Sequence, residues 1–238
     1  MANEKWEFDD DKRRRLALGV AGVKDGENDD EAVVRSRHAR LPEVSSRLVL
    51  SKNDRVIDLG SGMGYLAEVV APKVRSLVCV DISSSFLERT IARHQEKGLG
   101  NVEYVLTEYA DFSKHIQQRA TKIYSLLLFI HFNCFDYLYY LVECNRVLEL
   151  GGLLYFDMND GDRFKLHDAA DSFNKHIPIY KANRVNWIFG CMHLGSLTML
   201  RNIAPQVGFQ VETTWFGSTS FTQVLLRKVA EAPDLGGG

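Results

Sequence analysis

The sequence predicts an α/β fold in which a doubly wound, mostly parallel sheet is covered by helices on both faces. Apolar runs typical of strands alternate with helical patterns along most of the 238 residues. Residues 123–130 are almost continuously apolar, as in a central parallel strand that is buried on both faces. Three alternate glycines at residues 60–64 separate the first strand from the helix that follows, so the chain turns sharply there.

The elements are expected in a regular order. A helical N-terminal extension precedes the sheet and ends near residue 50. The apolar runs predict a seven-stranded sheet, with strands at residues 55–59, 77–81, 102–106, 123–130, 153–156, 209–215 and 220–228. Helices are expected at residues 65–70, 83–96, 135–148 and 196–205, and residues 107–119 are expected to form a polar loop and a short helix. Pro72 ends the first of these helices, one of the serines at 83–85 caps the second, and the glycines at 151–152 are expected to close the helix before them.

The chain is expected to form a single domain over residues 31–232. Residues 1–30 are charged and contain few large apolar side chains, which predicts a flexible N-terminal segment. Residues 161–195 are longer than a connection requires and hold several aromatic side chains, which predicts a cap over the site, inserted after the fifth strand. Residues 233–238 are expected to be a disordered tail.

Composition excludes several classes of partner and site. The formal net charge of −2 gives no basic field for a polyanion, so no nucleic acid partner is expected. The chain has no apolar run near about eighteen residues, so neither a membrane partner nor a spanning helix is expected. The four cysteines lack metal-ligand or Cys-x-x-Cys spacing, which predicts no metal site and favours reduced, buried thiols in a cytoplasmic protein.

The glycine turn marks the expected ligand site. Parallel sheets bind ligands beyond the carboxyl ends of their strands, and Asp81 ends the strand after the turn. In a dinucleotide-binding turn a small residue would stand at Tyr65, where close packing of helix on strand requires it. A bulky Tyr65, with Asp58 inside the preceding strand, disfavours NAD as the ligand.

Residues 56–64, which read Val-Ile-Asp-Leu-Gly-Ser-Gly-Met-Gly, resemble motif I of the class I S-adenosylmethionine-dependent methyltransferases. Residues 78–83, residues 143–152 and the pair Gly208-Phe209 resemble later motifs of that family in the same order. The resemblance covers roughly residues 45–228. It implies a Rossmann-like sheet whose last strand is antiparallel, with S-adenosylmethionine as methyl donor and S-adenosylhomocysteine as product.

The resemblance also implies a cofactor-binding set. Asp81 would accept hydrogen bonds from both ribose hydroxyls, and Ile82 would pack on the adenine. Asp58 would anchor the turn or the cofactor's ammonium group. The alternative is a structural role, in which Asp58 is a buried carboxylate that caps a neighbouring turn. The backbone against the cofactor's amino acid and sugar would come from Gly60, Ser61, Gly62 and Gly64, and the adenine would be edged by the loop that holds Glu108, Tyr109 and Asp111. Phe129 is a further cofactor-binding candidate. The usual Gly-Asp and Phe-Asp elements are replaced here by Thr107-Glu108 and Ile123-Tyr124, so the ribose contact rests on closer matches than the adenine contact.

Methyl transfer needs the acceptor aligned with an already activated methyl group, and a hydroxyl acceptor also needs a base. His131, directly after the fourth strand, is the first candidate for that base, with a structural histidine as the alternative. Asp157, together with Asn159 and Asp160 after the fifth strand, comes next. Arg37, His38 and Arg40 are either surface charges or groups that reach the cofactor carboxylate or an anionic acceptor.

The acceptor is expected to be a small molecule such as a metabolite, sugar or natural product. Residues 130–134 lack the Asn/Asp-Pro-Pro-Tyr/Phe pattern of amino-methylating nucleic-acid enzymes, and methylation at oxygen is favoured over nitrogen or carbon. A protein or RNA methyltransferase and a non-catalytic, cofactor-binding regulatory subunit are the alternatives. A monomer or a homodimer is expected.

Overall fold

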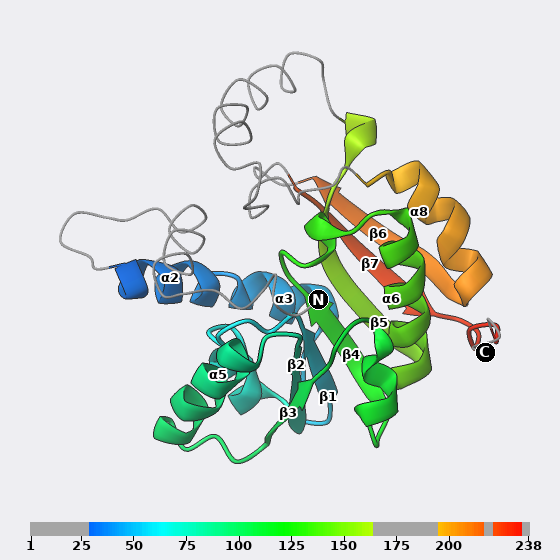
Figure 1. Ribbon diagram of the computed structural model, residues 1–238. Coiled ribbons are helices and arrows are strands. Elements are labelled where there is room, and N and C mark those ends of the chain that lie inside the picture. The colour runs from blue at the N-terminus through cyan, green and yellow to red at the C-terminus, as the bar shows by residue number, and fades with distance from the viewer. Residues whose placement is uncertain (1–28, 164–194, 217–220, 235–238) are drawn as a thin grey trace.

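The computed structural model describes residues 29–163, 195–216 and 221–234, and its centre is a seven-stranded sheet in the order β3-β2-β1-β4-β5-β7-β6 (Figure 1). The first five strands in the chain pair in parallel, and β7 pairs antiparallel with both β5 and β6. This confirms the predicted fold class and the antiparallel last strand. The strands are β1 Arg55–Leu59, β2 Ser76–Asp81, β3 Val102–Leu106, β4 Ala120–Ser125, β5 Leu148–Asn159, β6 Phe209–Phe216 and β7 Phe221–Lys228.

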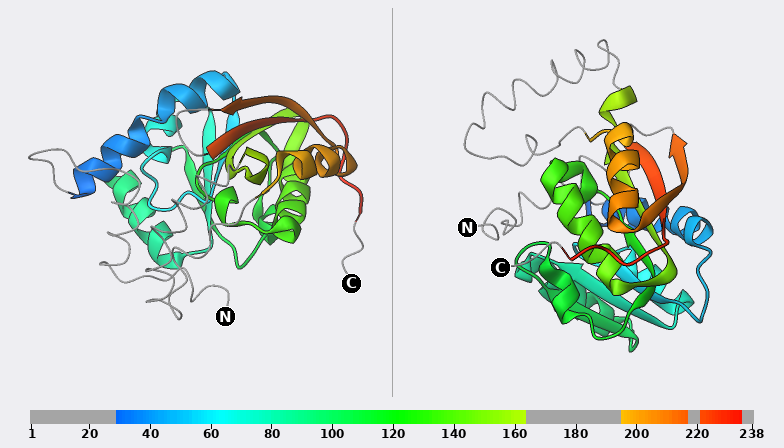
Figure 2. Two further views of the ribbon diagram at one scale, coloured as in Figure 1. Left: turned by 90° about the horizontal axis from the view of Figure 1, so that it is seen from above. Right: turned by 90° about the vertical axis from the view of Figure 1, so that its right-hand side faces the viewer.

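Helices cover both faces of this sheet. The α-helices are α2 Asp29–His38, α3 Leu41–Leu48, α4 Ala67–Val70, α5 Ser84–Glu96, α6 Cys134–Val147 and α8 Leu197–Ile203. Short 3₁₀ turns lie at η2 Ala71–Lys73, η3 Asp111–His115, η4 Phe129–His131, η5 Gly161–Arg163 and η6 Ala204–Val207. Buried side chains of α6 and α8 pack on one face, and those of α3, α4 and α5 on the other. Figure 2 shows the same division, with α2 and α3 on the side opposite α6 and α8.

Local capping explains where the two long helices begin. The Ser83 hydroxyl accepts a hydrogen bond from the N–H of Phe86 at 3.3 Å, so Ser83 is the N-cap of α5 as the sequence predicted. Asn133 caps α6 in a reciprocal arrangement, because its side chain accepts from the N–H of Asp136 while the Asp136 carboxylate accepts from the N–H of Asn133. Both caps stand at the carboxyl edge of the sheet, where the ligand site was expected.

Two element boundaries differ from the sequence prediction. β4 ends at Ser125 rather than at residue 130, because Leu127 takes a φ of +62°, which strand pairing does not allow. The glycines at 151–152 do not close α6, which ends at Val147; they lie inside β5, where Gly151 has a φ of +83°. The pairing of β4 with β5 is irregular over this stretch, and glycine accommodates the extra residues. β5 therefore continues to Asn159, and Asp157 lies within the strand.

Several expected regions fall outside the described residues. They are residues 1–28 of the N-terminal segment, residues 164–194 of the expected cap, and residues 235–238 of the tail. Within the described ranges, no helix has the length and apolar character that crossing a bilayer demands.

Candidate active site

The glycine turn after β1 is anchored on the neighbouring strand β2. The N–H groups of Gly60 and Ser61 both donate to the Val80 carbonyl, at 2.8 and 3.1 Å. Gly60, Gly62 and Gly64 have φ angles of +76°, +56° and +70°, a region that only glycine adopts readily. The three alternate glycines therefore reverse the chain immediately above the carboxyl edge of the sheet.

Asp81, the last residue of β2, joins this turn to the start of α5. One carboxylate oxygen accepts a hydrogen bond from the N–H of Gly62 at 2.7 Å, and the other accepts from the N–H of Ser83 at 2.9 Å. A carboxylate offers roughly four acceptor positions, so Asp81 can also accept from two ligand hydroxyls. A Cβ added at Gly62 would meet no atom of the described residues within 4 Å, so none of these residues covers the outer side of the turn beside Asp81.

Two residues of α5 that the sequence prediction missed hold the turn from the helix side. The Thr90 hydroxyl donates to the Gly62 carbonyl at 2.9 Å, and Nε2 of His94 lies 3.0 Å from the Gly64 carbonyl oxygen. A carbonyl only accepts, so Nε2 carries the hydrogen and Nδ1 is free to accept from the Tyr104 hydroxyl at 3.0 Å. Burial lowers the pKa of His94, which favours this neutral form. The feature of the sequence that could have pointed to these two residues is their spacing, because a Thr and a His four residues apart lie on one face of a helix.

Asp58 lies below the turn rather than on its open side. Its side chain is buried, and its Oδ2 accepts a hydrogen bond from the Tyr124 hydroxyl of β4 at 2.8 Å. Burial raises the pKa of Asp58 to about 7, and the hydrogen bond from Tyr124 opposes that rise. In the described structure Asp58 therefore ties β1 to β4 beneath the ligand edge, close to the alternative that the sequence left open.

The residues expected around an adenine ring lie on the loop after β3, beside the end of β2. The N–H of Thr107 donates to the Asp81 carbonyl at 3.0 Å, which holds this loop against the end of β2. Glu108 and Tyr109 are exposed, and the Asp111 carboxylate accepts from the Thr107 hydroxyl at 2.9 Å. Ile82 is half-buried between Asp81 and the N-cap of α5.

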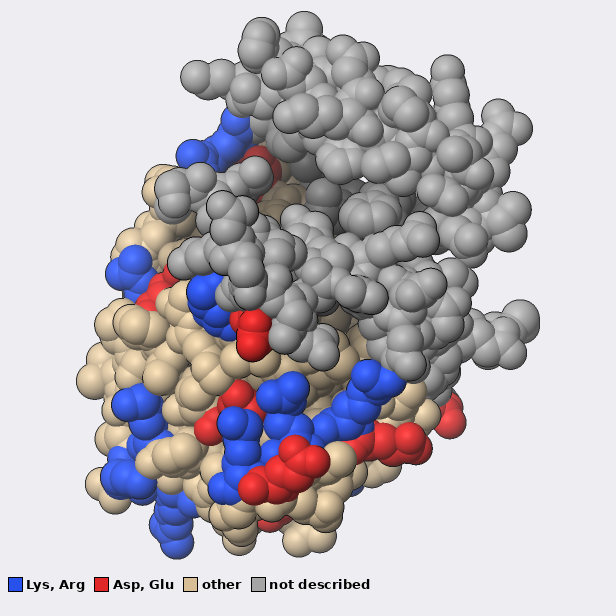
Figure 3. All heavy atoms as spheres, turned by 90° about the vertical axis from the view of Figure 1, so that its left-hand side faces the viewer, with Lys and Arg blue, Asp and Glu red and all other residues tan. Residues whose placement is uncertain are grey.

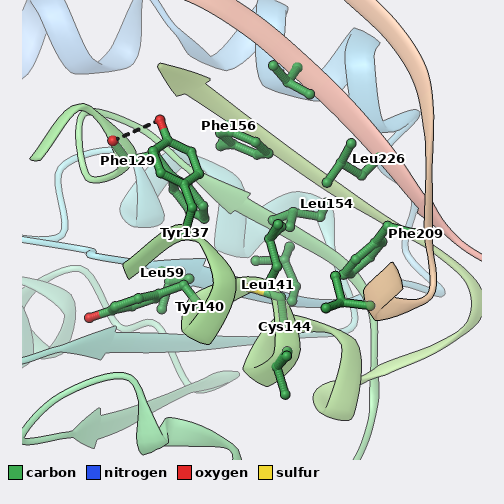
Figure 4. Close-up of a cluster of buried hydrophobic side chains, with 14 of the residues drawn as sticks. Leu59, Phe129, Tyr137, Tyr140, Leu141, Cys144, Leu154, Phe156, Phe209 and Leu226 are labelled. Carbon is green, nitrogen blue, oxygen red and sulfur yellow. Dashed lines mark hydrogen bonds between the residues drawn. The ribbon is translucent and has the colours of Figure 1, made fainter. Parts of the chain in front are cut away.

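Phe129 lies apart from the loop after β3, in the hydrophobic core. Its ring is fully buried and stacks on Phe156 of β5, with 4.2 Å between the ring centroids. Its backbone carbonyl accepts a hydrogen bond from the Tyr137 hydroxyl, and the close-up in Figure 4 shows the three aromatic side chains packed together. The structure thus places Phe129 in the core between sheet and α6. The sequence had put it in a strand, whereas η4 turns its side chain inward.

His131 and Asp157 lie on either side of the loop after β4. His131 is half-buried at the end of η4, at the carboxyl edge of the sheet. The Asp157 side chain is fully buried. Its Oδ1 accepts from the N–H of Leu127 at 2.6 Å, and its Oδ2 lies 3.5 Å from Nη2 of Arg40. Burial raises the pKa of Asp157, and the hydrogen bond from Leu127 and the nearby Arg40 oppose that rise.

Asp160 joins the two ends of the expected cap. Its Oδ1 accepts from the N–H of Leu197 at 3.2 Å, which fixes the start of α8. The N–H of Gly161 donates to the Gly195 carbonyl, and the N–H of Gly195 donates to the Asn159 carbonyl, each at 2.8 Å. The chain therefore leaves the sheet and returns to it at one point beside the carboxyl end of β5. Among the residues described, no three His, Cys, Asp or Glu side chains gather as a metal site would require.

Comparison with known proteins assigns the central part of the chain to a known kind of domain. Residues 56–152, which contain the glycine turn, Asp81 and the loops after β3 and β4, match the model of a methyltransferase domain family. A comparison with curated proteins gives no match.

Solved structures with the same fold are numerous, and three illustrate it. Magnesium protoporphyrin IX methyltransferase from Synechocystis, solved with bound S-adenosylhomocysteine, is 17% identical, with a TM-score of 0.64 over 92% of this chain and 93% of that one. An S-adenosylmethionine-dependent methyltransferase from Clostridium acetobutylicum is 13% identical, with a TM-score of 0.62 over 91% and 98%. Coclaurine N-methyltransferase bound to N-methylheliamine and S-adenosylhomocysteine is 18% identical, with a TM-score of 0.60 over 88% and 76%.

The matched domain model, the strand order and the glycine turn beside Asp81 agree with one another. Residues 56–152 therefore form a methyltransferase domain, and solved S-adenosylmethionine-dependent methyltransferases share the fold of this chain.

Proposed function

We propose that this enzyme transfers the methyl group of S-adenosylmethionine to a small-molecule acceptor, at an oxygen rather than at a nitrogen or carbon. The observation that carries the proposal is His131, half-buried on the carboxyl edge just beyond β4. An imidazole there takes a hydroxyl proton as the oxygen attacks the methyl group. An amine acceptor needs such a base less, because it can attack as the neutral amine.

The charges of the described surface support a small acceptor. On the face drawn in Figure 3, Lys and Arg side chains are interspersed with Asp and Glu side chains rather than gathered in a basic stripe. RNA binding relies on such stripes, because phosphate contacts supply most of its affinity. Two of the similar structures are named for small acceptors, magnesium protoporphyrin IX and coclaurine.

The cofactor is proposed to lie along the open side of the glycine turn. Asp81 accepts hydrogen bonds from the ribose hydroxyls, Ile82 packs on the adenine, and the loop at Glu108, Tyr109 and Asp111 edges it. Gly60 to Gly64 supply a backbone surface with no side chain between it and the ligand. The bound cofactor supplies an activated methyl group, and the protein contributes alignment and exclusion of water, with proximity alone worth roughly 7–11 kcal/mol.

Asp157 is proposed to position the loop after β4 rather than to move a proton. Both of its carboxylate oxygens already face donors, Leu127 and Arg40, and its side chain is fully buried. By accepting from Leu127 it stabilises the left-handed residue that turns the chain into η4. His131 sits at the end of that turn, so Asp157 acts on catalysis through the placement of His131.

The Asp81→Ala variant tests the cofactor site. Loss of a charged acceptor is expected to weaken S-adenosylhomocysteine binding by about 10- to 150-fold, since hydrogen bonds to charged groups contribute about 1.5–3 kcal/mol. Calorimetric titration measures this, with Glu103→Ala, an exposed carboxylate on β3, as the matched control. Unchanged affinity in Asp81→Ala would remove Asp81 from the site.

Methyl transfer from radiolabelled S-adenosylmethionine into a cell extract tests the acceptor class. Label in the small-molecule fraction is expected, whereas label in the RNA or protein fraction would overturn the proposal. With the labelled acceptor in hand, His131→Ala is expected to lower kcat by about 10²- to 10⁴-fold and to leave S-adenosylhomocysteine affinity unchanged. Equal kcat in the wild type and in His131→Ala would assign His131 a structural role. Cofactor binding by the wild type without any turnover would favour a regulatory subunit.

A further inference from the structure

Two loops at the carboxyl edge of the sheet meet at the first turn of α6. Tyr109, on the loop after β3, donates its hydroxyl to Oδ1 of Asp136 in that turn. The other carboxylate oxygen, Oδ2, accepts from the N–H of Asn133 at 3.0 Å. Asn133 stands two residues after His131 in the chain. The Asp136 carboxylate therefore connects the loop expected at the adenine with the segment that carries His131.

A buried ring on α6 gives the same two loops a second contact. Tyr140, four residues after Asp136, is buried, and its ring centroid lies 6.2 Å from that of Tyr109. The two ring planes meet at 68°, an edge-to-face geometry that stabilises aromatic pairs. The ring of Tyr140 also lies 4.2 Å from that of Phe132, which directly follows His131. Tyr109 is thus held at the start of α6 through both its hydroxyl and its ring.

Tyr109 also keeps a surface that a ligand can cover. The residue is 46% exposed although its hydroxyl is engaged. Its loop begins at Thr107, whose N–H donates to the Asp81 carbonyl at 3.0 Å. Partial burial, and then the hydrogen bond to Asp136, raise the pKa of Tyr109 to about 12, so the hydroxyl remains a donor at neutral pH. A ligand that rests on this loop beside Asp81 would restrict Tyr109, and through it Asp136.

We propose that the hydrogen bond between Tyr109 and Asp136 couples cofactor binding at the loop after β3 to the placement of His131. The cofactor orders Tyr109, Tyr109 holds the Asp136 carboxylate, and the carboxylate fixes Asn133 and the segment before it. Asp136 is then a positioning residue, and Tyr109 adds this role to its place beside the adenine. The inference rests on the proposed function, since it takes the cofactor site and the base from it. It implies that the acceptor finds the base in place only after the cofactor has bound.

Hydrogen–deuterium exchange with and without S-adenosylhomocysteine measures the coupling. The N–H groups of residues 131–133 are all hydrogen-bonded, so their exchange reports the opening of this segment. In the wild type the ligand is expected to slow exchange at residues 107–111 and, by about 5-fold or more, at residues 131–133. In Tyr109→Phe the slowing at residues 107–111 stays, and the slowing at residues 131–133 is lost. Tyr139→Phe, which removes the hydroxyl of another exposed ring on α6, is the matched control and should behave as the wild type does.

Equal slowing at residues 131–133 in Tyr109→Phe and in the wild type would overturn the inference. Faster exchange in the variant by the same factor with and without the ligand would also overturn it, because a purely structural bond has that effect. Asp136→Asn repeats the test independently, since an amide keeps only one of the two acceptor oxygens. A wild-type protein in which S-adenosylhomocysteine slows no exchange at residues 107–111 would instead refute the cofactor site itself.

Turnover provides a second measurement once the acceptor is identified. In Tyr109→Phe, kcat is expected to fall by about 10- to 100-fold, because a small misplacement of a reacting group has an effect of that size. In Tyr139→Phe, kcat should equal that of the wild type. Equal kcat in Tyr109→Phe and in the wild type would contradict the positioning role.

Discussion

At the scale of single residues, Asp58 and Asp81 lie within the last two residues of the neighbouring strands β1 and β2, yet their surroundings favour different charge states. Asp81 accepts from two backbone N–H groups at the edge of the site, which stabilises its charge. Asp58 lies one layer deeper, where its carboxylate accepts a hydrogen bond from the Tyr124 hydroxyl. Burial raises the pKa of Asp58 to about 7, so this carboxyl titrates close to neutral pH.

The pH dependence of stability should reveal this buried carboxyl. The pKa of Asp58 in the folded protein is about 7 and its ordinary value is 3.8, so between these pH values the folded state keeps a proton that the unfolded state releases. The contribution of Asp58 to stability is therefore fully present below pH 4 and is lost as pH rises through 7. One pKa unit corresponds to about 1.4 kcal/mol, so the loss is up to about 4 kcal/mol.

Urea unfolding of the wild type and of Asp58→Asn at pH 4.5 and pH 7 measures the effect. The free energy of unfolding of Asp58→Asn should improve relative to the wild type as pH rises, because Asn does not ionise. Tyr124→Phe provides a second check, since loss of the hydrogen bond raises the pKa of Asp58 further and extends the decline to higher pH. Wild-type and Asn curves that run parallel would contradict the assignment.

At the scale of elements, the glycine turn has two distinct sides. Gly64 faces α5, and a Cβ there would clash with Thr90 and lie 2.8 Å from Nε2 of His94. At Gly62 a Cβ would contact no other described residue, as expected of a side that a ligand approaches. The same residue type thus allows close helix packing at Gly64, and at Gly62 we expect it to allow close approach of a ligand.

Alanine at the two glycines should separate these roles. Gly64→Ala is expected to lower the free energy of unfolding by about 2–5 kcal/mol, because overpacking adds to the strain of a left-handed residue. Gly62→Ala carries only the strain, about 1–2 kcal/mol, and should mainly reduce S-adenosylhomocysteine affinity. Thermal unfolding and calorimetric titration of both variants provide the comparison. A larger loss of stability in Gly62→Ala than in Gly64→Ala would contradict the assignment of Gly64 to the helix side and Gly62 to the ligand side.

At the scale of the whole molecule, the site joins segments from both halves of the sheet. α2 and α3 reach the carboxyl edge through Arg40, which lies between Glu43 and Asp157 of β5. The Tyr155 hydroxyl of β5 donates to Glu43 as well. Arg47 of α3 lies 3.9 Å from the ring centre of Trp215 on β6. A ligand held at this edge would therefore connect elements that are distant in the sequence.

Ligand binding should stabilise the entire domain. At a cofactor concentration of about 100 times Kd the folded state gains about 2.7 kcal/mol, because the ligand binds only the folded protein. For a chain of this length that gain raises the melting temperature by roughly 5–11 °C. Differential scanning fluorimetry with S-adenosylhomocysteine measures the shift, and NAD at the same concentration is the control. A comparable shift with NAD would contradict the choice of nucleotide.

The fold and the cofactor edge were largely predictable because their patterns are local. Strand β1, the N-cap at Ser83 and the glycine turn each depend on neighbouring residues in the sequence. The position of Asp81 beside the turn follows once two strands are known to pair in parallel. Thr90 and His94 could not be assigned, because a buried polar side chain acquires its role from whichever backbone packs against it.

By itself, the sequence predicted the α/β class, the antiparallel last strand and the methyl donor, since periodicity, glycine spacing and motif order are properties of short segments. Only the tertiary structure decided that Asp58 and Phe129 are buried behind the site, and that Asp157 is engaged by Leu127 and Arg40. These outcomes depend on contacts across the sheet. Residues that are far apart in the chain bury these side chains and supply the donors that each carboxylate binds.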